Sequence, residues 1–226
     1  MNVLITGGAG FIGSHITDKY LNAGHNAIVV DNLSHGDERN ITKKCIFYKD
    51  DISENIEYIF KENKIDLINH HAAQVDLRLS QHKPVYDIKK NIIAGVNLLN
   101  TAVKYNVKKI IFASSGGAVY GEQKEFPANE NHSTEPLSPY GINKLAFEHY
   151  LKFYKSYYGL EYVILRYANI YGPKQSLKGE GGVVSVFLKK ILKGEIPIIN
   201  GSGKNTRDFV YVDDVANANL QALNYK

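Results

Sequence analysis

The chain has 226 residues, of which 44% are hydrophobic and 22% are charged, and its formal net charge is +4 at pH 7. This composition is that of an ordinary globular protein and excludes collagen-like, low-complexity and disulfide-rich chains. The single cysteine, Cys45, cannot form an internal disulfide or a thiolate metal cluster. Lysines are scattered rather than gathered in a dense block, so we expect small anionic ligands and no nucleic-acid partner.

The sequence shows neither a secretory leader nor a membrane span. The opening apolar run, Asn2–Thr6, is short and has no basic leader. No run of about 18 apolar residues follows anywhere. We therefore expect a cytoplasmic protein without a membrane partner.

Short apolar runs alternate with longer stretches of helical periodicity, which is typical of a parallel sheet covered by helices on both faces. The predicted strands are Asn2–Thr6, Ala27–Val30, Cys45–Tyr48, Asp66–His70, Lys109–Ser114 and Tyr162–Tyr167. This order predicts an α/β fold with a doubly wound parallel sheet, the Rossmann fold, over residues 1–167.

After Tyr167 the alternation stops. Gly172 with Pro173 and the stretch Gly179–Gly182 interrupt the chain, and an amphipathic run, Val184–Leu192, follows. We predict that residues 168–204 form part of a smaller substrate-binding lobe. The segment 205–226, with a helix over Val212–Tyr225, is expected to return to the first domain. No closing element follows, so we expect the lobe to be incomplete.

A glycine-rich turn links the first predicted strand to the first helix. Gly7, Gly10 and Gly13 stand where a missing side chain permits a tight turn, close approach of a pyrophosphate and close helix packing. The helix N-terminus then faces the anion. The first two glycines are one residue further apart than in the common dinucleotide fingerprint, so the pattern gains weight only from its position between strand and helix.

An acidic residue, Asp31, ends the second predicted strand, close to the spacing of about 20 residues at which a carboxylate binds the adenosine ribose. A 2′-phosphate would be repelled there, and no Arg follows at once, so we predict NAD rather than NADP. Asn32 is expected to help position the ribose. The alternative is a solvated Asp at a strand end.

Further cofactor contacts are expected after the third and fourth strands. Asp51 is placed to meet the adenine amino group and Ile52 to cover a ring face, although a plain loop Asp fits the spacing almost as well. Small residues would let the chain run close to the cofactor at His71, Ala72, Ala73 and Gln74. The pair His70 and His71 lacks acidic or thiol partners at ligand spacing, so we predict packing or hydrogen bonding and no metal site.

A tyrosine and a lysine lie four residues apart at the start of a predicted helix introduced by Ser138 and Pro139. Tyr140 and Lys144 therefore share one helix face. A nearby ammonium favours the phenolate, so Lys144 is expected to lower the pKa of Tyr140 toward the range of a base at neutral pH. The pair becomes informative because a nucleotide turn and the strand-end hydroxyls of Ser114 and Ser115 precede it.

In order, the motifs TGGAGFIGS, DNLS at Asp31, SSGGAVYG from Ser114, YGINK and RDFVYVDD from Arg207 resemble one known family. It is the extended short-chain dehydrogenase/reductases that modify nucleotide sugars, the NAD-dependent epimerase/dehydratase family. The resemblance spans essentially the whole chain. Within the family it is strongest to the UDP-sugar 4-epimerases, which implies interconversion of UDP-glucose and UDP-galactose or of N-acetylated or uronic analogues.

The resemblance implies a mechanism. Tyr140 takes the proton of the sugar 4-hydroxyl, and Lys144 binds the nicotinamide ribose and acidifies Tyr140. A 4-keto sugar forms, turns over and regains the hydride on its other face, so NAD is regenerated without leaving. A homodimer is implied through helices near Lys83–Tyr105 and Ala146–Tyr158.

The resemblance also assigns binding residues. Those expected along the cofactor are Phe11, Ile12, Asn91, Ser114, Tyr167 and Ile170. Those expected along the UDP-sugar are Asn169, Val183, Asn200 and Arg207. Arg207 fits best on physical grounds because a guanidinium binds phosphate oxygens bidentately. Its alternative is a surface Arg paired with Asp208.

The chain departs from the family pattern in two places. Gly116 occupies the position where many relatives carry a catalytic Ser or Thr, so the role is assigned to Ser115, with Ser114 or a water as alternatives. The chain also ends before the family's C-terminal elements. We expect weakened binding of the nucleotide sugar and intact NAD binding.

Two other functions compete. A nucleotide-sugar 4,6-dehydratase needs an acid and a base beside the catalytic Thr, where this chain has Gly116 and Gly117. A regulatory or scaffold protein could keep the NAD site without catalysis, but it would not require the reactive pair Tyr140 and Lys144. Epimerisation is therefore favoured over both.

Overall fold

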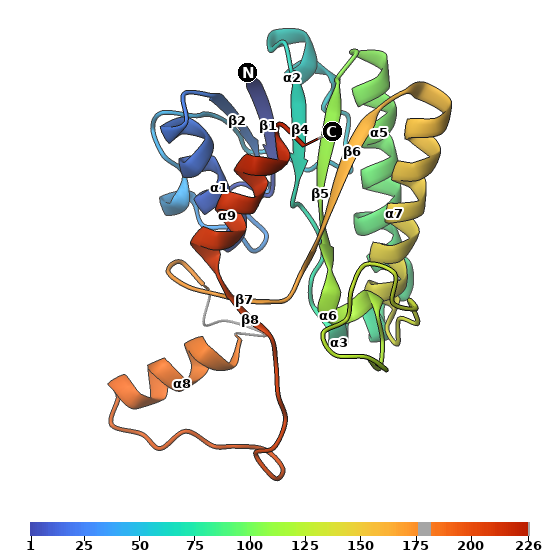
Figure 1. The fold of residues 1–226 in the computed structure, drawn as a ribbon. Helices are drawn as coiled ribbons and strands as arrows, with labels where there is room; N and C mark the ends of the chain where they lie inside the picture. The colour runs from blue at the N-terminus through green and yellow to red at the C-terminus, as the bar shows by residue number, and fades with distance from the viewer. Residues whose placement is uncertain (176–181, 226) are drawn as a thin grey trace.

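The computed structural model describes residues 1–175 and 182–225. Its centre is a six-stranded parallel sheet in the order β3-β2-β1-β4-β5-β6, beside a two-stranded parallel sheet of β7 and β8 (Figure 1). The strands are β1 (Asn2–Thr6), β2 (Asn26–Val30), β3 (Ile46–Tyr48), β4 (Leu67–His70), β5 (Lys109–Ser115), β6 (Glu161–Tyr167), β7 (Asn169–Tyr171) and β8 (Phe209–Tyr211). The strand order reverses between β1 and β4, which confirms the predicted doubly wound fold.

Helices cover both faces of the large sheet. The helices of the described residues are α1 (Phe11–Asn22), α2 (Glu57–Glu62), α3 (Leu77–His82), α4 (Pro84–Ile88), α5 (Ala94–Lys104), α6 (Gly116–Val119), α7 (Pro139–Tyr158), α8 (Val183–Leu192) and α9 (Val212–Ala222), with short helical turns η1 (Glu38–Asn40) and η2 (Lys89–Ile93). Helices α1 and α9 pack on one face, and α2, α5 and α7 on the other. None of the helices in the described residues is long and apolar enough to cross a membrane.

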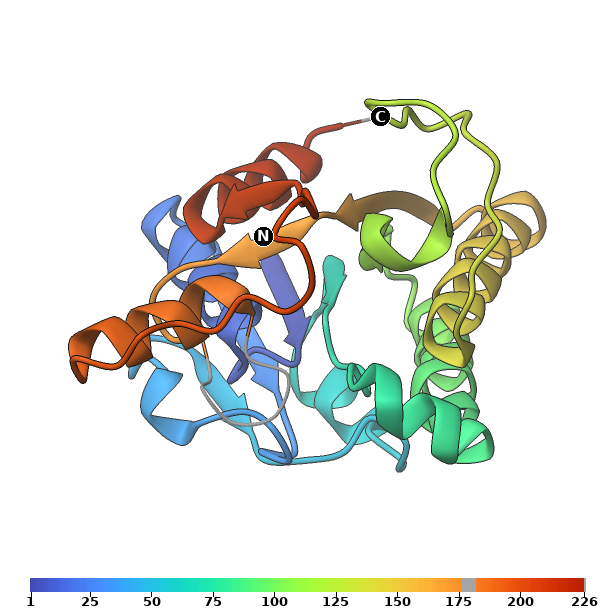
Figure 2. The ribbon, with the colours of Figure 1, turned by 90° about the horizontal axis from the view of Figure 1, so that it is seen from below.

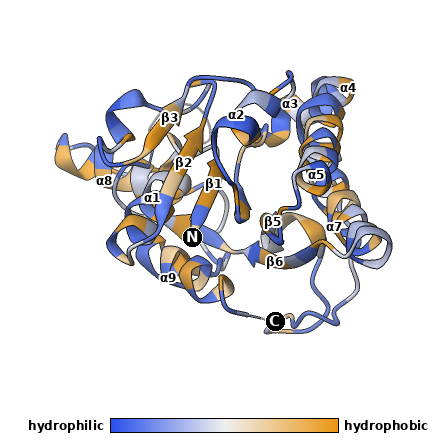
Figure 3. Ribbon diagram, turned by 90° about the horizontal axis from the view of Figure 1, so that it is seen from above, coloured by the Kyte–Doolittle hydropathy of each residue, from blue (hydrophilic) through white to orange (hydrophobic). Residues whose placement is uncertain are grey.

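Alternation along β1 builds a separate core on each face of the sheet. Val3 and Ile5 pack with Ile16 and the other apolar residues on the α1 side. Leu4, between them, packs into the core of α2, α5 and α7. All are fully buried, so the strand is apolar on both faces. Figure 3 shows hydrophobic colouring along the strands that lie between the helices. Truncating such a side chain to Ala costs about 2–5 kcal/mol.

The helix that carries the predicted reactive pair, α7, has strong signals at both ends. The Ser138 side chain accepts a hydrogen bond from the Gly141 N–H at 3.1 Å, and Pro139 fills the first helical position. Gly159 ends the helix with a left-handed backbone, φ 72°. Start and end are thus set by local chemistry, and the predicted start is confirmed.

Some predicted boundaries are wrong by a few residues. Cys45 lies outside β3 because its N–H bonds to the Thr42 carbonyl in a turn. The last helix ends at Ala222 rather than Tyr225, since the Leu223 N–H already bonds three residues back, in a tightening turn. Of the predicted Gly179–Gly182 interruption, residues 179–181 lie outside the described residues.

The segment after β6 leaves the sheet and returns to it. Helix α8 stands apart from the sheet, with apolar side chains such as Leu192 (86% exposed) open to solvent (Figure 1). The chain then comes back through β8 into α9, which lies against α1. Its Ala216 shares a core with Ile16. The division of the chain into two domains stays a prediction.

Candidate active site

The carboxyl ends of the parallel strands meet at one edge of the sheet, seen end-on in Figure 2. The turn after β1 lies there and requires glycine at Gly7 and Gly13. A Cβ on Gly13 would lie 2.3 Å from the Gly7 carbonyl oxygen, and one on Gly7 would lie 2.7 Å from the Ala72 nitrogen. Gly7 also has φ +72°, which favours glycine. The turn therefore brings the end of β1 against the segment after β4.

Helix α1 begins at this turn with its first N–H groups toward the strand ends. Its N-cap, Gly10, offers no side-chain hydrogen bond to the first turn, which includes Phe11 and Ile12. Free N–H groups and the helix dipole attract an anion at such a terminus. A glycine turn followed by an uncapped helix start fits a pyrophosphate.

Asp31, just after β2, is almost fully buried (8% exposed). Its Oδ2 accepts a hydrogen bond from the Ala9 N–H at 3.0 Å and its Oδ1 from the Leu33 N–H at 2.8 Å. Burial raises the pKa of Asp31, and the two N–H groups partly oppose this. No lysine or arginine in the described residues pairs with it. Each oxygen has acceptor capacity left for a ribose hydroxyl.

Asp51 is held in a polar cluster at the neighbouring strand end. Its Oδ2 accepts from Lys90 at 2.7 Å and from Asn32 at 2.9 Å, and its Oδ1 from the Ser53 hydroxyl at 2.6 Å. Burial raises the pKa of Asp51, but these hydrogen bonds outweigh it and hold the pKa well below its usual range. The next residue, Ile52, belongs to the core (7% exposed). Their predicted contacts with adenine stay predictions.

The imidazole of His71, after β4, is oriented by a chain of hydrogen bonds. Its Nε2 lies 2.9 Å from the Tyr167 hydroxyl, which accepts from the Asn219 amide at 2.7 Å. The phenol proton is then directed to Nε2, so Nδ1 carries the ring proton. Burial lowers the pKa of His71 to about 3, which keeps the ring neutral. Nδ1 is buried and has no hydrogen-bond partner in the structure. Its N–H group therefore needs an acceptor.

Two predicted cofactor residues, Gln74 and Asn91, satisfy each other. The Asn91 side chain accepts from the Gln74 N–H at 2.8 Å and donates to the Gln74 carbonyl at 2.9 Å. Ala72, beside them, donates its N–H to the Thr6 hydroxyl at 3.1 Å. These contacts fix the chain after β4 against β1. The direct contact of Asn91 with the cofactor stays a prediction.

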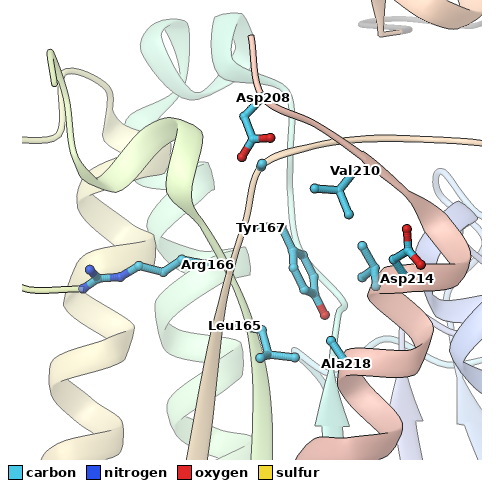
Figure 4. A pocket seen from close by; sticks show the side chains of 9 residues that line it. Leu165, Arg166, Tyr167, Asp208, Val210, Asp214 and Ala218 are labelled. Atoms are coloured by element: carbon cyan, nitrogen blue, oxygen red, sulfur yellow. The ribbon is translucent and has the colours of Figure 1, made fainter. Parts of the chain in front are cut away.

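A cavity of about 280 Å³ lies between β6, β8 and α9 (Figure 4). Its lining residues are Leu165, Arg166, Tyr167, Ala168, Asp208, Val210, Asp214, Val215 and Ala218. The Tyr167 ring points into it toward α9, whereas the Arg166 side chain leaves β6 in the opposite direction. Neither Tyr140 nor Lys144 lines it, so this cavity is not the site of proton transfer.

Lys144 is buried (5% exposed) beside Tyr140 on α7. Its Nζ donates to the Ala113 carbonyl at 2.8 Å and lies 4.7 Å from the Phe112 ring centroid and 5.7 Å from the Tyr140 ring centroid. Burial lowers the pKa of Lys144 to about 8, and the charges of Asp87 and Glu148 oppose this. The amine is therefore held at the end of β5 with N–H donors to spare.

The expectation that Lys144 lowers the pKa of Tyr140 is wrong for this structure. Burial raises the Tyr140 pKa to about 12, the Asp87 charge adds to this, and a hydrogen bond with Ser115 opposes it. The reason is geometric: the ammonium of Lys144 is directed at the Ala113 carbonyl. Desolvation of the phenolate therefore dominates.

Adjacent hydroxyls at the end of β5 have different partners. Ser114 donates to the buried Glu148 carboxylate at 2.5 Å. Ser115, at the start of α6, makes no capping hydrogen bond, and its hydroxyl lies close enough to Tyr140 to lower the pKa of the phenol. A side chain at position 116 would be crowded, since a Cβ on Gly116 would lie 3.3 Å from the Arg166 carbonyl oxygen. The structure thus brings Ser115, and not Ser114, to the phenol.

Sequence reasoning missed the acidic residues around this pair. Glu148 is buried and accepts both from Ser114 and from Arg166, whose Nη2 lies 2.6 Å away. Asp87 is fully buried and acts electrostatically on both Tyr140 and Lys144. A signal existed for Glu148 alone, because it lies four residues after Lys144 on the same face of the helix.

The four predicted substrate residues lie beyond β6. Asn169 donates to the Asp208 carbonyl at 3.0 Å, where β7 meets β8. Arg207 is exposed and donates to the Thr206 carbonyl at 2.7 Å, and the described residues show no ion pair between it and Asp208. Val183 begins α8, and Asn200 is exposed. Their contacts with a UDP-sugar stay predictions.

The model of the NAD dependent epimerase/dehydratase family matches residues 3–226. The chain belongs to this family. A putative UDP-glucose 4-epimerase of Methanocaldococcus jannaschii is 50% identical over 225 residues, which cover 99% of this chain and 74% of that protein. This family membership confirms the resemblance inferred from the motifs.

Solved structures of epimerases share the fold closely. The UDP-glucose 4-epimerase of Thermotoga maritima, crystallised with UDP-glucose, is 48% identical with a TM-score of 0.97, covering 99% of this chain and 74% of that one. A UDP-N-acetylglucosamine 4-epimerase of Methanobrevibacter ruminantium, in complex with UDP-N-acetylmuramic acid, is 37% identical with a TM-score of 0.94, covering 100% and 74%.

The residues at the sheet edge fit the NAD on which this family depends. A Cβ would fill the turn at Gly7 and Gly13, Asp31 has free acceptor capacity, and the buried Nδ1 of His71 wants an acceptor. In the described part of the chain, no cluster of His, Cys, Asp or Glu could hold a metal ion.

Proposed function

We propose that this family member is an NAD-dependent UDP-sugar 4-epimerase that interconverts UDP-glucose and UDP-galactose. The placement of Ser115 against the Tyr140 phenol, with Lys144 buried beside them, carries the proposal. This group stands at the same sheet edge as the glycine turn, so a hydroxyl to be oxidised and a nucleotide cofactor would meet there. The similarity to 4-epimerases supports the reaction.

The residues that would hold NAD come from three strand ends. The turn Gly7–Gly13 would receive the pyrophosphate, Asp31 the adenosine ribose hydroxyls, and His71 Nδ1 an acceptor oxygen. When bound, NAD supplies a hydride acceptor that also gives the hydride back. The site residues named here are proposals.

Tyr140 would take the proton of the sugar 4-hydroxyl and return it after the 4-keto sugar has turned over. The pKa of about 12 means that the phenolate must be favoured during the reaction. The Ser115 hydroxyl can donate to the phenol oxygen, and the Lys144 ammonium has N–H donors beyond the one used by Ala113. Both groups would therefore stabilise the phenolate.

Other sugars and reactions remain as alternatives. The similarity to a UDP-N-acetylglucosamine 4-epimerase favours N-acetylated sugars as a second substrate class. A 4,6-dehydratase would need an acid and a base near Ser115, but Gly116 and Gly117 stand there. A protein that binds NAD without catalysis would not require the Tyr140 phenol beside Lys144.

The direct test is to incubate the chain with UDP-galactose and measure UDP-glucose, with UDP-N-acetylgalactosamine assayed in parallel. We expect conversion of at least one pair without added NADH. Tyr140→Phe should retain bound NAD, measured after denaturation, and lose most turnover. A chain that binds NAD and the UDP-sugar but converts neither pair would contradict the epimerase proposal and favour the binding protein.

We also propose a homodimer formed by the neighbouring faces of α4, η2 and α7. Apolar side chains are exposed there, including Tyr86 (44%), Ile93 (49%), Phe153 (50%) and Tyr157 (72%). Phe153→Glu should shift the molar mass in light scattering from dimer to monomer, whereas Phe126→Glu, in the loop before α7, should not. A wild-type monomer at micromolar concentration would contradict the dimer.

We propose a cytoplasmic location, in agreement with a single free cysteine, Cys45. Fractionation of the source cells tests it, since recovery with the membrane or secreted fraction would contradict it.

A further inference from the structure

Asp87, on α4, is a buried carboxylate surrounded by amides. It is 0% exposed. Its Oδ1 accepts from the Gln74 amide at 2.6 Å, and its Oδ2 accepts from the Asn91 amide at 3.1 Å and the Asn143 amide at 2.6 Å. In the described residues no lysine or arginine pairs with it directly. A buried carboxylate without a cation is costly, so its retention calls for a reason beyond packing.

The surrounding amides present donors to this carboxylate. The Gln74 side-chain oxygen accepts from the Asp76 N–H, and the Asn91 side-chain oxygen accepts from the Gln74 N–H. Backbone donors thus fix both amides with their NH₂ groups toward Asp87. A carboxylate group, which only accepts, matches these donors.

This charge lies next to the reactive turn of α7. Asn143, which donates to Asp87, follows Tyr140 by three residues and precedes Lys144 by one. The Asp87 charge acts on both, raising the pKa of Tyr140 and of Lys144. The amide of Asn143 therefore ties the turn to α4, and the carboxylate sets its electrostatic surroundings.

The other ionisable groups that face Lys144 do not replace Asp87. Glu148, on α7, forms an ion pair with Arg166 of β6, with Nη2 and Oε2 2.6 Å apart, so its charge is compensated. From β4, His70 and His71 face Lys144 as neutral rings, because burial lowers the pKa of each to about 3. The phenol of Tyr140 is neutral as well. Among the described residues Asp87 is then a negative charge without an ion-pair partner, and it favours the ammonium together with Glu148.

We propose that Asp87 is a positioning residue for the catalytic pair. Through Asn143 it fixes the turn that carries Tyr140 and Lys144, and its buried charge keeps the Lys144 amine protonated at neutral pH. The inference rests on the proposed function for the meaning of the pair, but the charge state of Lys144 is a property of the chain without substrate.

The experiment compares Asp87→Asn with Asp76→Asn, which removes a carboxylate that caps α3 instead of facing Lys144. The readout is the pH titration of the Lys144 ¹³Cε signal in chain labelled at lysine, assigned by its loss in Lys144→Met. Asp87→Asn should lower the Lys144 pKa by about one unit or more, and Asp76→Asn should leave it in place. An unmoved Lys144 titration in folded Asp87→Asn overturns the proposal.

Activity supplies a second readout. Because Asp87 raises the pKa of both Tyr140 and Lys144, Asp87→Asn should move both limbs of the pH–rate profile to lower pH. A purely structural role would lower the maximum without moving the limbs. Asn143→Ala keeps the Asp87 carboxylate and removes the hydrogen bond between α7 and Asp87. It should therefore lower kcat by about tenfold and leave the pKa of Lys144 unchanged. A native kcat in Asn143→Ala overturns the positioning role.

Should Asp87→Asn fail to fold, the double variant Asp87→Asn with Asn143→Asp restores a donor facing a carboxylate. It moves the charge to the turn itself, so the Lys144 pKa should stay at or above its native value. A pKa lowered by about one unit overturns the proposal. If the native chain shows the predicted Lys144 titration but no epimerase activity, the result contradicts the proposed function and leaves the role of Asp87 standing.

Discussion

The Ser115 hydroxyl lies against the Tyr140 phenol and lowers its pKa, whereas the hydroxyl one residue earlier, on Ser114, is bound to Glu148 at 2.5 Å. Neighbouring residues of one strand end thus divide between the reactive side and the core. Both partners lie on α7, with Tyr140 in its first turn and Glu148 eight residues further along the helix.

The two serines provide a matched pair of variants. Ser115→Ala should lower kcat by about 10- to 100-fold with an unchanged melting temperature, because it removes a hydrogen bond to the phenol oxygen. Ser114→Ala should lower the free energy of unfolding by about 1–3 kcal/mol, because the buried Glu148 loses a donor, and should change kcat far less. Steady-state kinetics and urea unfolding distinguish them. The reverse pattern would place the catalytic hydroxyl on Ser114.

Asp31 is expected to select NAD over NADP. Asp31→Ala should weaken the binding of NAD by about tenfold or more, since a charged acceptor for ribose hydroxyls is lost. It should weaken the binding of NADP much less, because a charge that repels the 2′-phosphate is lost as well. Calorimetric titration with each cofactor measures both changes. Equal losses for the two cofactors would contradict the ribose assignment, with thermal unfolding as the control for the Ala9 and Leu33 hydrogen bonds.

The glycine turn offers a test based on space alone. Gly13→Ala puts a Cβ 2.3 Å from the Gly7 carbonyl oxygen, so the turn must open. NAD binding should fall by more than about tenfold and stability by about 1–3 kcal/mol. Gly117→Ala, where a Cβ meets nothing within 4 Å, is the control and should leave both unchanged. Normal NAD affinity in Gly13→Ala would mean that this turn does not hold the pyrophosphate.

The buried ring of His70 should make stability depend on pH. Burial lowers its pKa from 6.5 to about 3, so between these values the unfolded chain binds a proton that the folded chain does not. Stability therefore falls as pH drops from about 6.5 toward 3, with a slope of up to about 1.4 kcal/mol per pH unit from this residue. His70→Gln keeps an acceptor for Thr6, 2.7 Å from His70 Nδ1 in the structure. It should flatten the slope in urea unfolding, and an unchanged slope would contradict the assignment.

The sheet and the reactive helix were predictable because their signals are local. Alternation of apolar runs predicts β1 to β6, and Ser138, Pro139 and the spacing of Tyr140 and Lys144 predict α7 and its reactive face. The glycine turn was also predictable, since only close backbone contact requires Gly7 and Gly13.

The electrostatics of the site could not be predicted from the sequence. Lys144 is adjacent to Tyr140 on the helix, yet burial and the Ala113 carbonyl decide the pKa values. Asp87 comes from another element, and its charge reaches the pair only through the packing of α4 on α7. Such terms depend on tertiary contacts between distant segments, which no spacing rule contains.

The short ladder of β7 and β8 has a consequence for how this family member can diversify. The chain leaves the large sheet after β6 and packs against α1 again at α9, and Asn169 and Phe209 stand side by side in that ladder. The two ends of the intervening segment are therefore held together at its base. We expect that this segment can be exchanged for another one while the large sheet keeps its own core.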